Sequence, residues 1–249
     1  MKHSLKNKLT RLSPLMGTLL TLPSPEIAEI LCSAGFDWLF VDLEHSALSI
    51  KDAQAILQAA SPKVPCVIRV PLNDEIWIKK SLDTGLSGII VPQILSAEEA
   101  AQAVRWCKYP PEGSRGFGIA RAQGYGANFK TYVDSANADI AVILQIEHIT
   151  TIDNIEAIVR VPGIDCLFIG PYDLSVSMGK MGQVNDPEIQ DAIARVKQCA
   201  DEVGIPTGIF GASPEAVRPY IEDGYSLIAI GIDTMIFGEA ARKIADASR

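Results

Sequence analysis

The stretch SPEIAEILCSAGFDWLFVDLEH, residues 24–45, contains one complete unit of helix, turn and strand. Ser24–Glu26 form a helix start, because Ser caps the first turn, Pro fits its first positions and the acid faces the positive end of the helix dipole. Gly35 follows the helical pattern, and a left-handed glycine commonly ends a helix. The apolar run Trp38–Asp42 then has the length of a buried strand, and polar residues follow it.

The same kind of unit recurs along the chain. The short apolar runs that we predict as strands are Met16–Leu20, Trp38–Asp42, Pro65–Arg69, Ser87–Val91, Val142–Ile146, Cys166–Gly170, Pro206–Phe210 and Leu227–Ile230. The glycines that end intervening helical patterns are Gly35, Gly85, Gly204 and Gly224, and the residues that can cap helix starts are Ser24, Ser49, Asn73, Ser96, Asp186 and Ser213. This repeated punctuation is what a series of βα units requires.

Eight strand-sized runs predict an α/β fold, a single (β/α)₈ TIM barrel that forms one domain over residues 1–249. Such a barrel typically has about 250 residues. The runs are nearly continuous in apolar residues, as expected for a parallel sheet covered by helices. The alternative is a doubly wound open sheet, but its usual GxGxxG motif after the first strand is absent.

Composition and charge exclude several classes of function. With 48% hydrophobic and 21% charged residues, the chain can bury a full core. The 22 Lys and Arg against 30 Asp and Glu give a net charge of −8, which argues against nucleic-acid and membrane partners. No apolar run approaches the ~18 residues of a membrane span. The five cysteines form no CxxC pair, so we expect buried, reduced thiols and a cytoplasmic location.

Polar side chains gather where the predicted strands end. They are Asp42, Glu44, His45, Arg69, Gln93, Gln145, Glu147, Asp173 and Asp233. Because the carboxyl ends of all strands meet at one mouth of a barrel, we expect these side chains to converge on a site there. No lysine ends a strand, which argues against chemistry through a lysine Schiff base.

Two acids in this group predict a metal site. Glu147 and Asp173 come from adjacent predicted strands, so their carboxylates can share one hard cation such as Mg²⁺ or Mn²⁺. The alternative is a structural pair of acids, bridged through Arg69 or bonded to loop amides. Arg69 would lie near the cation and could stabilise an oxyanion. His45 is placed to act as a general base near neutral pH.

The segment Pro110–Gly126 (PPEGSRGFGIARAQGYG) interrupts the alternation of strands and helices. It is long and rich in glycine, and it carries Arg115, Arg121 and Tyr125. Long loops in compact domains are usually functional or disordered. We expect a lid or an interface, with an ordinary insertion as the alternative.

Six strings in order resemble a known family. They are VDLEHSALSI (41–50), VIRVP (67–71), IIVPQI (89–94), YPPEGSRGFG (109–118), LQIE (144–147) and FIGPYDLS (168–175). Together they resemble the HpcH/HpaI class II (metal-dependent) aldolases, a family that includes 4-hydroxy-2-oxoheptanedioate aldolase and 2-dehydro-3-deoxyglucarate aldolase. The similarity extends over residues 17–245.

The resemblance implies a role for each matching position. By it, Glu147 and Asp173 are the metal ligands, Arg69 is the pyruvate-side arginine and His45 is the active-site histidine. Further matches are Asp83, the acid paired with that histidine, Asp42 and Gln145 in outer positions, and Gly170, Pro171 and Tyr172, whose backbone cradles the substrate carboxylate. The resemblance also implies a homo-oligomer, a hexamer, in which the last helix is exchanged between subunits.

Some positions depart from the family pattern. Leu43 stands where the family often has a glycine, and His148 stands where Ser or Thr is common. The string GIFGAS (208–213) also differs at the seventh strand. These changes put the choice of aldehyde in doubt, and we expect Leu43 and Arg121 to influence which substrate tail is accepted.

The residues and the resemblance together predict a divalent-metal-dependent aldolase, with Mg²⁺ or Mn²⁺ and with Co²⁺ as an alternative ion. It would reversibly cleave a 4-hydroxy-2-oxo acid to pyruvate and an aldehyde. Its partner would therefore be a small-molecule 2-oxo acid substrate. His45, directly or through a water, would remove the C4 hydroxyl proton. Two alternatives remain: a lyase similar to the citrate-lyase β subunit, acting on an acyl-CoA thioester, and a non-catalytic barrel that binds 2-oxo acids. The first needs a basic entrance, and only Arg115 and Arg121 could provide it.

Overall fold

The computed structural model describes residues 5–9 and 13–248, and its centre is a closed barrel of parallel strands in the order β1 to β8. The strands are β1 (Leu15–Leu20), β2 (Trp38–Asp42), β3 (Cys66–Arg69), β4 (Gly88–Val91), β5 (Ala141–Ile146), β6 (Cys166–Ile169), β7 (Thr207–Gly211) and β8 (Leu227–Ile232). β1 pairs with both β2 and β8, which closes the sheet on itself. The predicted (β/α)₈ barrel is confirmed, and the doubly wound open sheet is wrong.

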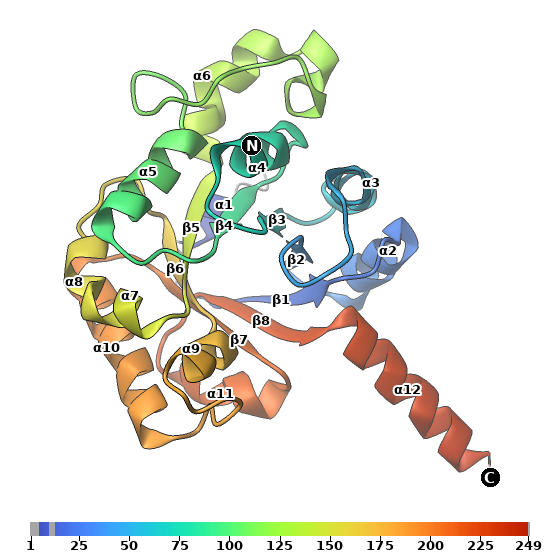
Figure 1. The fold of residues 1–249 in the computed structure, drawn as a ribbon. Helices are drawn as coiled ribbons and strands as arrows, with labels where there is room; N and C mark the ends of the chain where they lie inside the picture. Colours follow the sequence, from blue (N-terminus) through green and yellow to red (C-terminus); the bar gives the residue numbers. More distant parts are fainter. Residues whose placement is uncertain (1–4, 10–12, 249) are drawn as a thin grey trace.

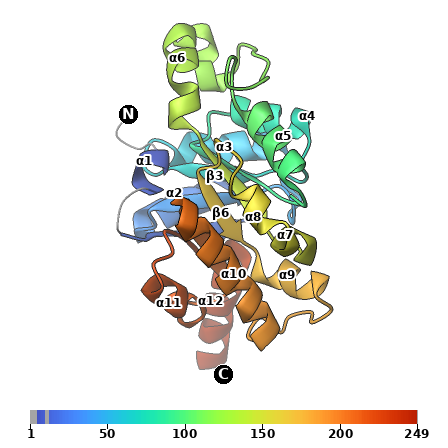
Figure 2. The ribbon, with the colours of Figure 1, turned by 90° about the vertical axis from the view of Figure 1, so that its left-hand side faces the viewer.

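Helices cover the outside of the barrel (Figures 1 and 2). They are α1 (Leu5–Leu9), α2 (Pro25–Ala34), α3 (Ile50–Ala60), α4 (Glu75–Asp83), α5 (Ala97–Cys107), the 3₁₀ segment η1 (Arg121–Gly126), α6 (Phe129–Asp139), α7 (Ile149–Asp153), α8 (Ile155–Ile158), α9 (Pro171–Ser177), α10 (Pro187–Val203), α11 (Pro214–Glu222) and α12 (Asp233–Ala247). None of the helices within the described ranges has the length and apolar character needed to cross a bilayer.

Most of the helix boundaries that the sequence predicts are confirmed. The side chains that accept a backbone N–H at a helix start are Ser24, Ser49, Ser96, Asp186 and Ser213. The glycines Gly35, Gly85, Gly204 and Gly224 all have positive φ. The start of α4 differs, because Asp74 is its cap and the predicted Asn73 lies one residue earlier. A charged carboxylate is the stronger acceptor for the free N–H groups of a first turn.

The amino end of the barrel is filled by α1. Leu5 and Leu9 are buried with the inward-facing aromatic residues of the barrel, including Trp38 and Phe168. This interior is tightly packed: a Cβ at Gly17 would lie 2.4 Å from the Trp38 ring, so only glycine fits there. Because the amino end is closed, the carboxyl ends of the strands are where a ligand can enter.

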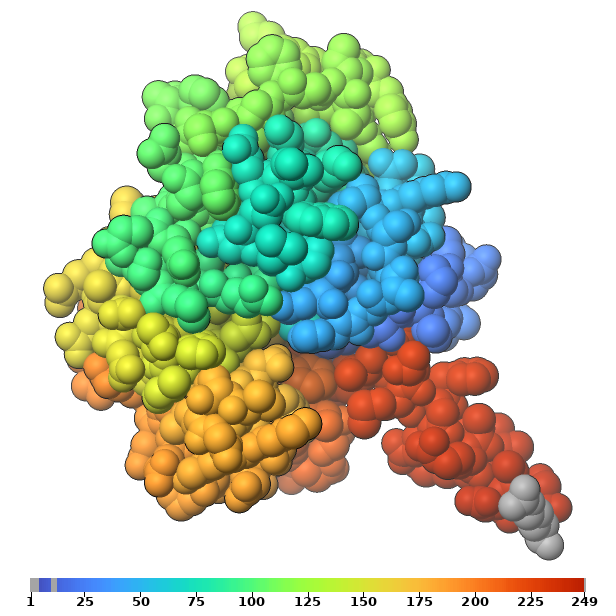
Figure 3. All heavy atoms as spheres, viewed as in Figure 1, coloured from blue at the N-terminus to red at the C-terminus, as the bar shows by residue number. Residues whose placement is uncertain are grey.

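The last helix, α12, begins against the barrel and then extends away from it (Figures 1 and 3). Its first residue, Asp233, is buried and accepts the main-chain N–H groups of Thr21 and Leu22, both at 2.9 Å. Beyond it, the large apolar residues exposed on this helix are Met235, Ile236, Phe237 and Ile244. Within the described part of the chain, Asp233 is the only buried residue of α12, so its own chain leaves most of the apolar surface of this helix uncovered.

The five cysteines are free thiols, four of them buried and Cys32 half-buried. Burial raises the pKa of the Cys107 thiol to about 12, so it stays protonated at neutral pH. These are structural thiols rather than nucleophiles.

Candidate active site

A buried ion pair stands at the carboxyl ends of β2 and β3. Asp42 and Arg69 are partners in the register of the two strands, so their side chains leave the sheet together. Arg69 donates from Nε to Asp42 Oδ1 at 2.8 Å and from Nη2 to Asp42 Oδ2 at 2.6 Å. Asp42 is 1% and Arg69 is 7% exposed. This two-pronged, charge-assisted contact fixes the plane of the guanidinium group.

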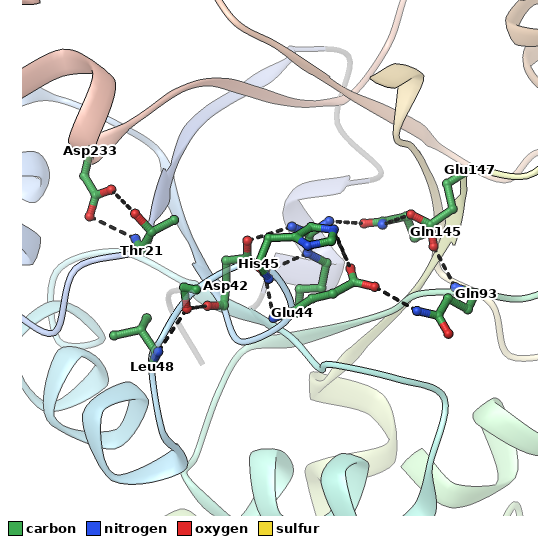
Figure 4. A network of polar contacts seen from close by, with 11 residues as sticks. Thr21, Asp42, Glu44, His45, Leu48, Gln93, Gln145, Glu147 and Asp233 are labelled. Atoms are coloured by element: carbon green, nitrogen blue, oxygen red, sulfur yellow. Dashed lines mark hydrogen bonds and ion pairs between the residues drawn. The ribbon is translucent and has the colours of Figure 1, made fainter. Parts of the chain in front are cut away.

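A ring of contacts at the mouth of the barrel includes Glu44, Gln93, Gln145 and Glu147, which lie close together in Figure 4, and Arg69 joins it. Arg69 Nη1 donates to Gln145 Oε1 at 3.3 Å and lies 3.2 Å from Glu44 Oε2. Gln145 Nε2 donates to Glu147 Oε2. Glu147 Oε1 accepts the main-chain N–H of Gln93 at 2.7 Å, and Gln93 Nε2 donates to Glu44 Oε1 at 3.2 Å. The ring therefore fixes two acids, Glu44 and Glu147, through amide and guanidinium donors.

The carboxylates of Glu147 and Asp173 both come close to Gly170 and line the same cavity. A Cβ at Gly170 would lie 3.7 Å from Glu147 Oε2 and 3.8 Å from Asp173 Oδ2, so one oxygen of each acid lies next to this residue. Within residues 5–9 and 13–248, no group of three or more His, Cys, Asp and Glu side chains is arranged to hold a metal ion. Two carboxylates that line one cavity fit Mg²⁺ or Mn²⁺, which accept substrate and water oxygens in their remaining positions.

Two cavities open at this mouth. One, of about 410 Å³, is lined by the polar residues Thr21, Asp42, His45, Arg69, Gln145 and Asp173 and by Leu19, Phe40, Phe168, Gly170, Pro171, Tyr172, Phe210, Ala212, Ile232 and Met235. The other, of about 470 Å³, is lined by Glu44, His45, Gln93, Leu95, Glu147, His148, Asp173, Val176 and Ser177. His45 and Asp173 border both. A small ligand at this boundary can therefore meet the acids and the imidazole together.

His45 faces the site from the loop after β2. Its side chain is 59% exposed, and Nε2 lies 3.9 Å from Glu44 Oε2. Its main-chain N–H donates to Asp42 Oδ1 at 3.4 Å, which ties the loop to the buried ion pair. An accessible imidazole beside a carboxylate suits proton transfer to or from a bound ligand.

Glu44 was expected among the polar side chains at the mouth of the barrel, but the sequence-based prediction gave it no chemical role. Burial raises the pKa of the Glu44 carboxyl to about 7; Arg69 opposes the shift and Glu147 adds to it. Among the residues that the structure describes, none makes a hydrogen bond to its Oε2. At neutral pH this carboxyl is close to half-protonated. Within one chain, the acid that lies beside His45 is Glu44, and not the expected Asp83.

We expect Glu44→Gln to change how stability depends on pH. A free glutamate titrates near 4.5 and Glu44 titrates at about 7 in the folded chain, so its stabilising contribution is complete below pH 4.5 and is lost as the pH rises through 7. From pH 5 to pH 8, the wild type should lose about 1–2 kcal/mol of unfolding free energy relative to the variant. This is less than the ~3 kcal/mol of the whole shift, because water in the cavity screens the carboxyl.

Urea unfolding in EDTA at both pH values measures this difference. Glu222→Gln, at an exposed position at the end of α11, is the matched control and should follow the wild type. If the wild type and Glu44→Gln lose equal stability between pH 5 and pH 8, Glu44 is not a perturbed acid.

Two expected site residues, Asp83 and Arg121, lie at the other end of the barrel. Asp83 is the last residue of α4, which returns the chain to the amino end of β4, and its Oδ1 accepts from Arg115 Nη2 at 3.0 Å. Arg121 Nη1 donates to the carbonyl oxygen of Thr84, the residue after α4, at 2.6 Å. His45 stands at the carboxyl end. Within one chain, the expected pairing of Asp83 with His45 is therefore not made, and Arg121 does not line the cavities.

The other candidates for tail recognition also lie away from the cavities. Leu43 is 5% exposed and packs in the main hydrophobic core, so it does not meet a ligand tail in this chain. The segment 110–126 packs by Arg121 against the ends of α3 and α4, so it does not cover the mouth of its own barrel. The large apolar residues that it exposes are Phe117, Ile119 and Tyr125. Of its two expected roles, an interface fits this position and a lid does not.

Comparisons with known proteins identify the family. The model of the HpcH/HpaI aldolase/citrate lyase family matches residues 16–240. A hydroxypyruvate/pyruvate aldolase of Paraburkholderia phytofirmans is 40% identical over 250 residues, which cover 97% of this chain and 95% of that protein. A 2-dehydro-3,6-dideoxy-6-sulfogluconate aldolase of Pseudomonas putida is 42% identical over 246 residues, or 95% and 93% of the two chains. A solved HpcH/HpaI aldolase/citrate lyase family protein from Burkholderia cenocepacia is 36% identical, with a TM-score of 0.95 over 99% of both chains. The chain therefore belongs to the HpcH/HpaI aldolase/citrate lyase family and is a carbon–carbon lyase.

Proposed function

We propose that this enzyme is a divalent-metal-dependent aldolase that reversibly cleaves a 4-hydroxy-2-oxo acid to pyruvate and an aldehyde. Its substrate would be of the 2-dehydro-3-deoxy sugar acid or the 4-hydroxy-2-oxo-dicarboxylate type. The observation that carries the proposal is the pair of carboxylates, Glu147 and Asp173, that line one cavity with His45, while Asp173 and His45 also border the adjoining cavity that Arg69 lines. The names of the two relatives, which refer to 2-oxo acids and a deoxy sugar acid, support this class of substrate.

The residues of the site can divide the reaction between them. A divalent cation held by Glu147 and Asp173 supplies Lewis acidity to the bound 2-oxo acid. His45 accepts the proton of the C4 hydroxyl while the C3–C4 bond breaks. The O–H electrons form the aldehyde carbonyl, and the C3–C4 pair becomes the enolate of pyruvate. Arg69, held in place by Asp42, stabilises the enolate charge, and a proton returned to C3 completes pyruvate.

The test is pyruvate release from a panel of 4-hydroxy-2-oxo acids with neutral, hydroxylated and dicarboxylate tails. Release is followed by coupling to lactate dehydrogenase, with Mg²⁺, Mn²⁺ or Co²⁺ added to EDTA-treated protein. We expect the rate of pyruvate release to depend on the added ion and to differ between substrates with different tails. The ranking identifies the aldehyde that the site accepts.

Three results would contradict the proposal. Turnover that is unchanged in EDTA would remove the metal from the mechanism. Cleavage of an acyl-CoA thioester with no release from the panel would favour chemistry of the citrate-lyase type. Calorimetric binding of pyruvate with no turnover of any substrate would indicate a barrel that only binds 2-oxo acids.

We also propose that the enzyme works as a homo-oligomer, a hexamer by resemblance, in which α12 packs on a neighbouring subunit. The apolar side chains that α12 exposes, such as Phe237 at 71% and Ile244 at 71%, support this arrangement. A contact between Asp83 and His45 requires a second copy of the chain. Light scattering tests the assembly, and a monomeric mass would contradict it. The free thiols are consistent with a location in the reducing cytoplasm.

A further inference from the structure

Gln93 has a backbone conformation that its residue type rarely adopts. It follows β4 and Pro92, and its φ is +58°, in the left-handed region. Among the described residues other than glycine, only Tyr125 shares a positive φ. The Gln93 side chain is exposed, so core packing does not explain the conformation. Such strained residues cluster at functional sites, where the surroundings hold them in place.

The conformation gives Gln93 two separate contacts. Its main-chain N–H donates to Glu147 Oε1 at 2.7 Å, and its side-chain Nε2 donates to Glu44 Oε1 at 3.2 Å (Figure 4). Rotation about N–Cα sets the angle between the N–H and the side chain. In the right-handed region both lie on the same side, whereas the left-handed region turns them apart. One residue can thereby reach two acids that follow different strands.

We propose that Gln93 is a positioning residue that sets the geometry of both acids, Glu147 through its main chain and Glu44 through its side chain. The main-chain N–H of Gln93 holds Glu147 Oε1, while Gln145 Nε2 donates to Oε2, the oxygen that lies near Gly170 and Asp173. The amide of Gln93 likewise holds Glu44 Oε1, which leaves Oε2 toward Arg69 and His45. The inference rests on the proposed function, since Glu147 is a metal ligand there and Glu44 lies beside His45, the proposed base.

Two variants separate the main-chain contact from the side-chain contact. Gln93→Gly loses the amide but keeps the N–H in a residue that adopts positive φ freely. Gln93→Val also loses the amide, and its branched side chain disfavours positive φ, so the N–H is displaced. Both variants therefore lack the side-chain amide, and they differ from each other in the backbone conformation at residue 93.

Titration calorimetry of the purified protein with Mn²⁺ reads the main-chain contact without any turnover. We expect Gln93→Val to bind Mn²⁺ about 10-fold or more weakly and Gln93→Gly to stay within about threefold of the wild type, as for other residues that orient metal ligands. Gln93→Gly should lower kcat for pyruvate release about tenfold at saturating Mn²⁺, because Glu44 has lost its amide partner.

Tyr125 supplies the matched control. It has the same kind of backbone conformation, with φ +55°, but it lies in the segment that packs at the amino end of the barrel. Tyr125→Gly and Tyr125→Val should shift the melting temperature in opposite directions and leave the Mn²⁺ affinity unchanged. A purely structural role for Gln93 would give the same pattern.

If the wild type binds no Mn²⁺, a double-mutant cycle of Glu147→Gln and Gln93→Val, measured by urea unfolding, still tests the inference. Such a result would overturn the proposed metal and not the role of Gln93. In EDTA, Glu147→Gln should shift the urea midpoint less in Gln93→Val than in wild type, because their contact is already broken. Equal shifts in both backgrounds, or equal loss of Mn²⁺ affinity in Gln93→Gly and Gln93→Val, would overturn the inference.

Discussion

Substitution of Glu147 by alanine should lower kcat/KM for pyruvate release by at least about 10³-fold and leave the barrel folded, because several kcal/mol of charge stabilisation depend on this residue if it holds the metal as proposed. Glu147 Oε2 and Asp173 Oδ2 both lie near Gly170, and the described residues include no third acidic, His or Cys side chain grouped with them that could replace Glu147 as a ligand. Its two donors, Gln93 and Gln145, line cavities, so water can take over their hydrogen bonds. The fold therefore survives the loss.

The measurement combines three readings of purified Glu147→Ala. Coupled pyruvate release gives the activity, calorimetry gives the affinity for Mn²⁺, and circular dichroism with a melting curve gives the fold. Glu222→Ala, exposed at the end of α11, is the control and should match the wild type in all three. If Glu147→Ala keeps more than a tenth of the activity, or binds Mn²⁺ as well as wild type, Glu147 is not the metal ligand.

The barrel could be predicted from the sequence because each strand is marked locally. In the unit around Gly35 and Trp38–Asp42, the glycine ends the helix with φ +98° and the apolar run becomes β2 with the predicted bounds. Part of the site could also be predicted from local sequence, because polar residues follow the apolar strands directly. Asp42 and Arg69 end neighbouring strands, so parallel pairing alone places them side by side.

What the sequence did not reveal depends on geometry that a string of residues does not contain. Glu44 and Gln93 were expected at the mouth of the barrel without a specific role, because their hydrogen bonds arise from the loop after β2 and from the φ of one residue. Asp83 was assigned by its match to the family, and such a match states a role without stating which copy of the chain supplies the residue. The ion pair that Asp83 makes with Arg115 therefore could not be foreseen.

The second large effect concerns Arg69, whose removal should destabilise the fold as well as the reaction. Asp42 is 1% exposed and both its oxygens accept from Arg69, while Glu44 Oε2 lies 3.2 Å from Arg69 Nη1. Arg69→Ala leaves these carboxylates without a cation, so we expect a loss of about 3–5 kcal/mol in unfolding free energy, as for other broken buried pairs. Arg69→Lys keeps the charge but not the two-pronged contact and should lose less.

A second substitution separates the unpaired charge from lost packing. Asp42→Asn in the Arg69→Ala background removes the stranded charge, so it should recover part of the stability, whereas in wild type the same change should destabilise. Urea unfolding of all four proteins measures the coupling. Arg195→Ala, which breaks an exposed ion pair with Glu156 at 3.6 Å, should change stability by less than about 0.5 kcal/mol. Recovery of stability without recovery of pyruvate release would assign Arg69 two separate roles, support of the buried acid and stabilisation of the enolate. No recovery of stability would show that packing, and not charge, is what Arg69 contributes to the fold.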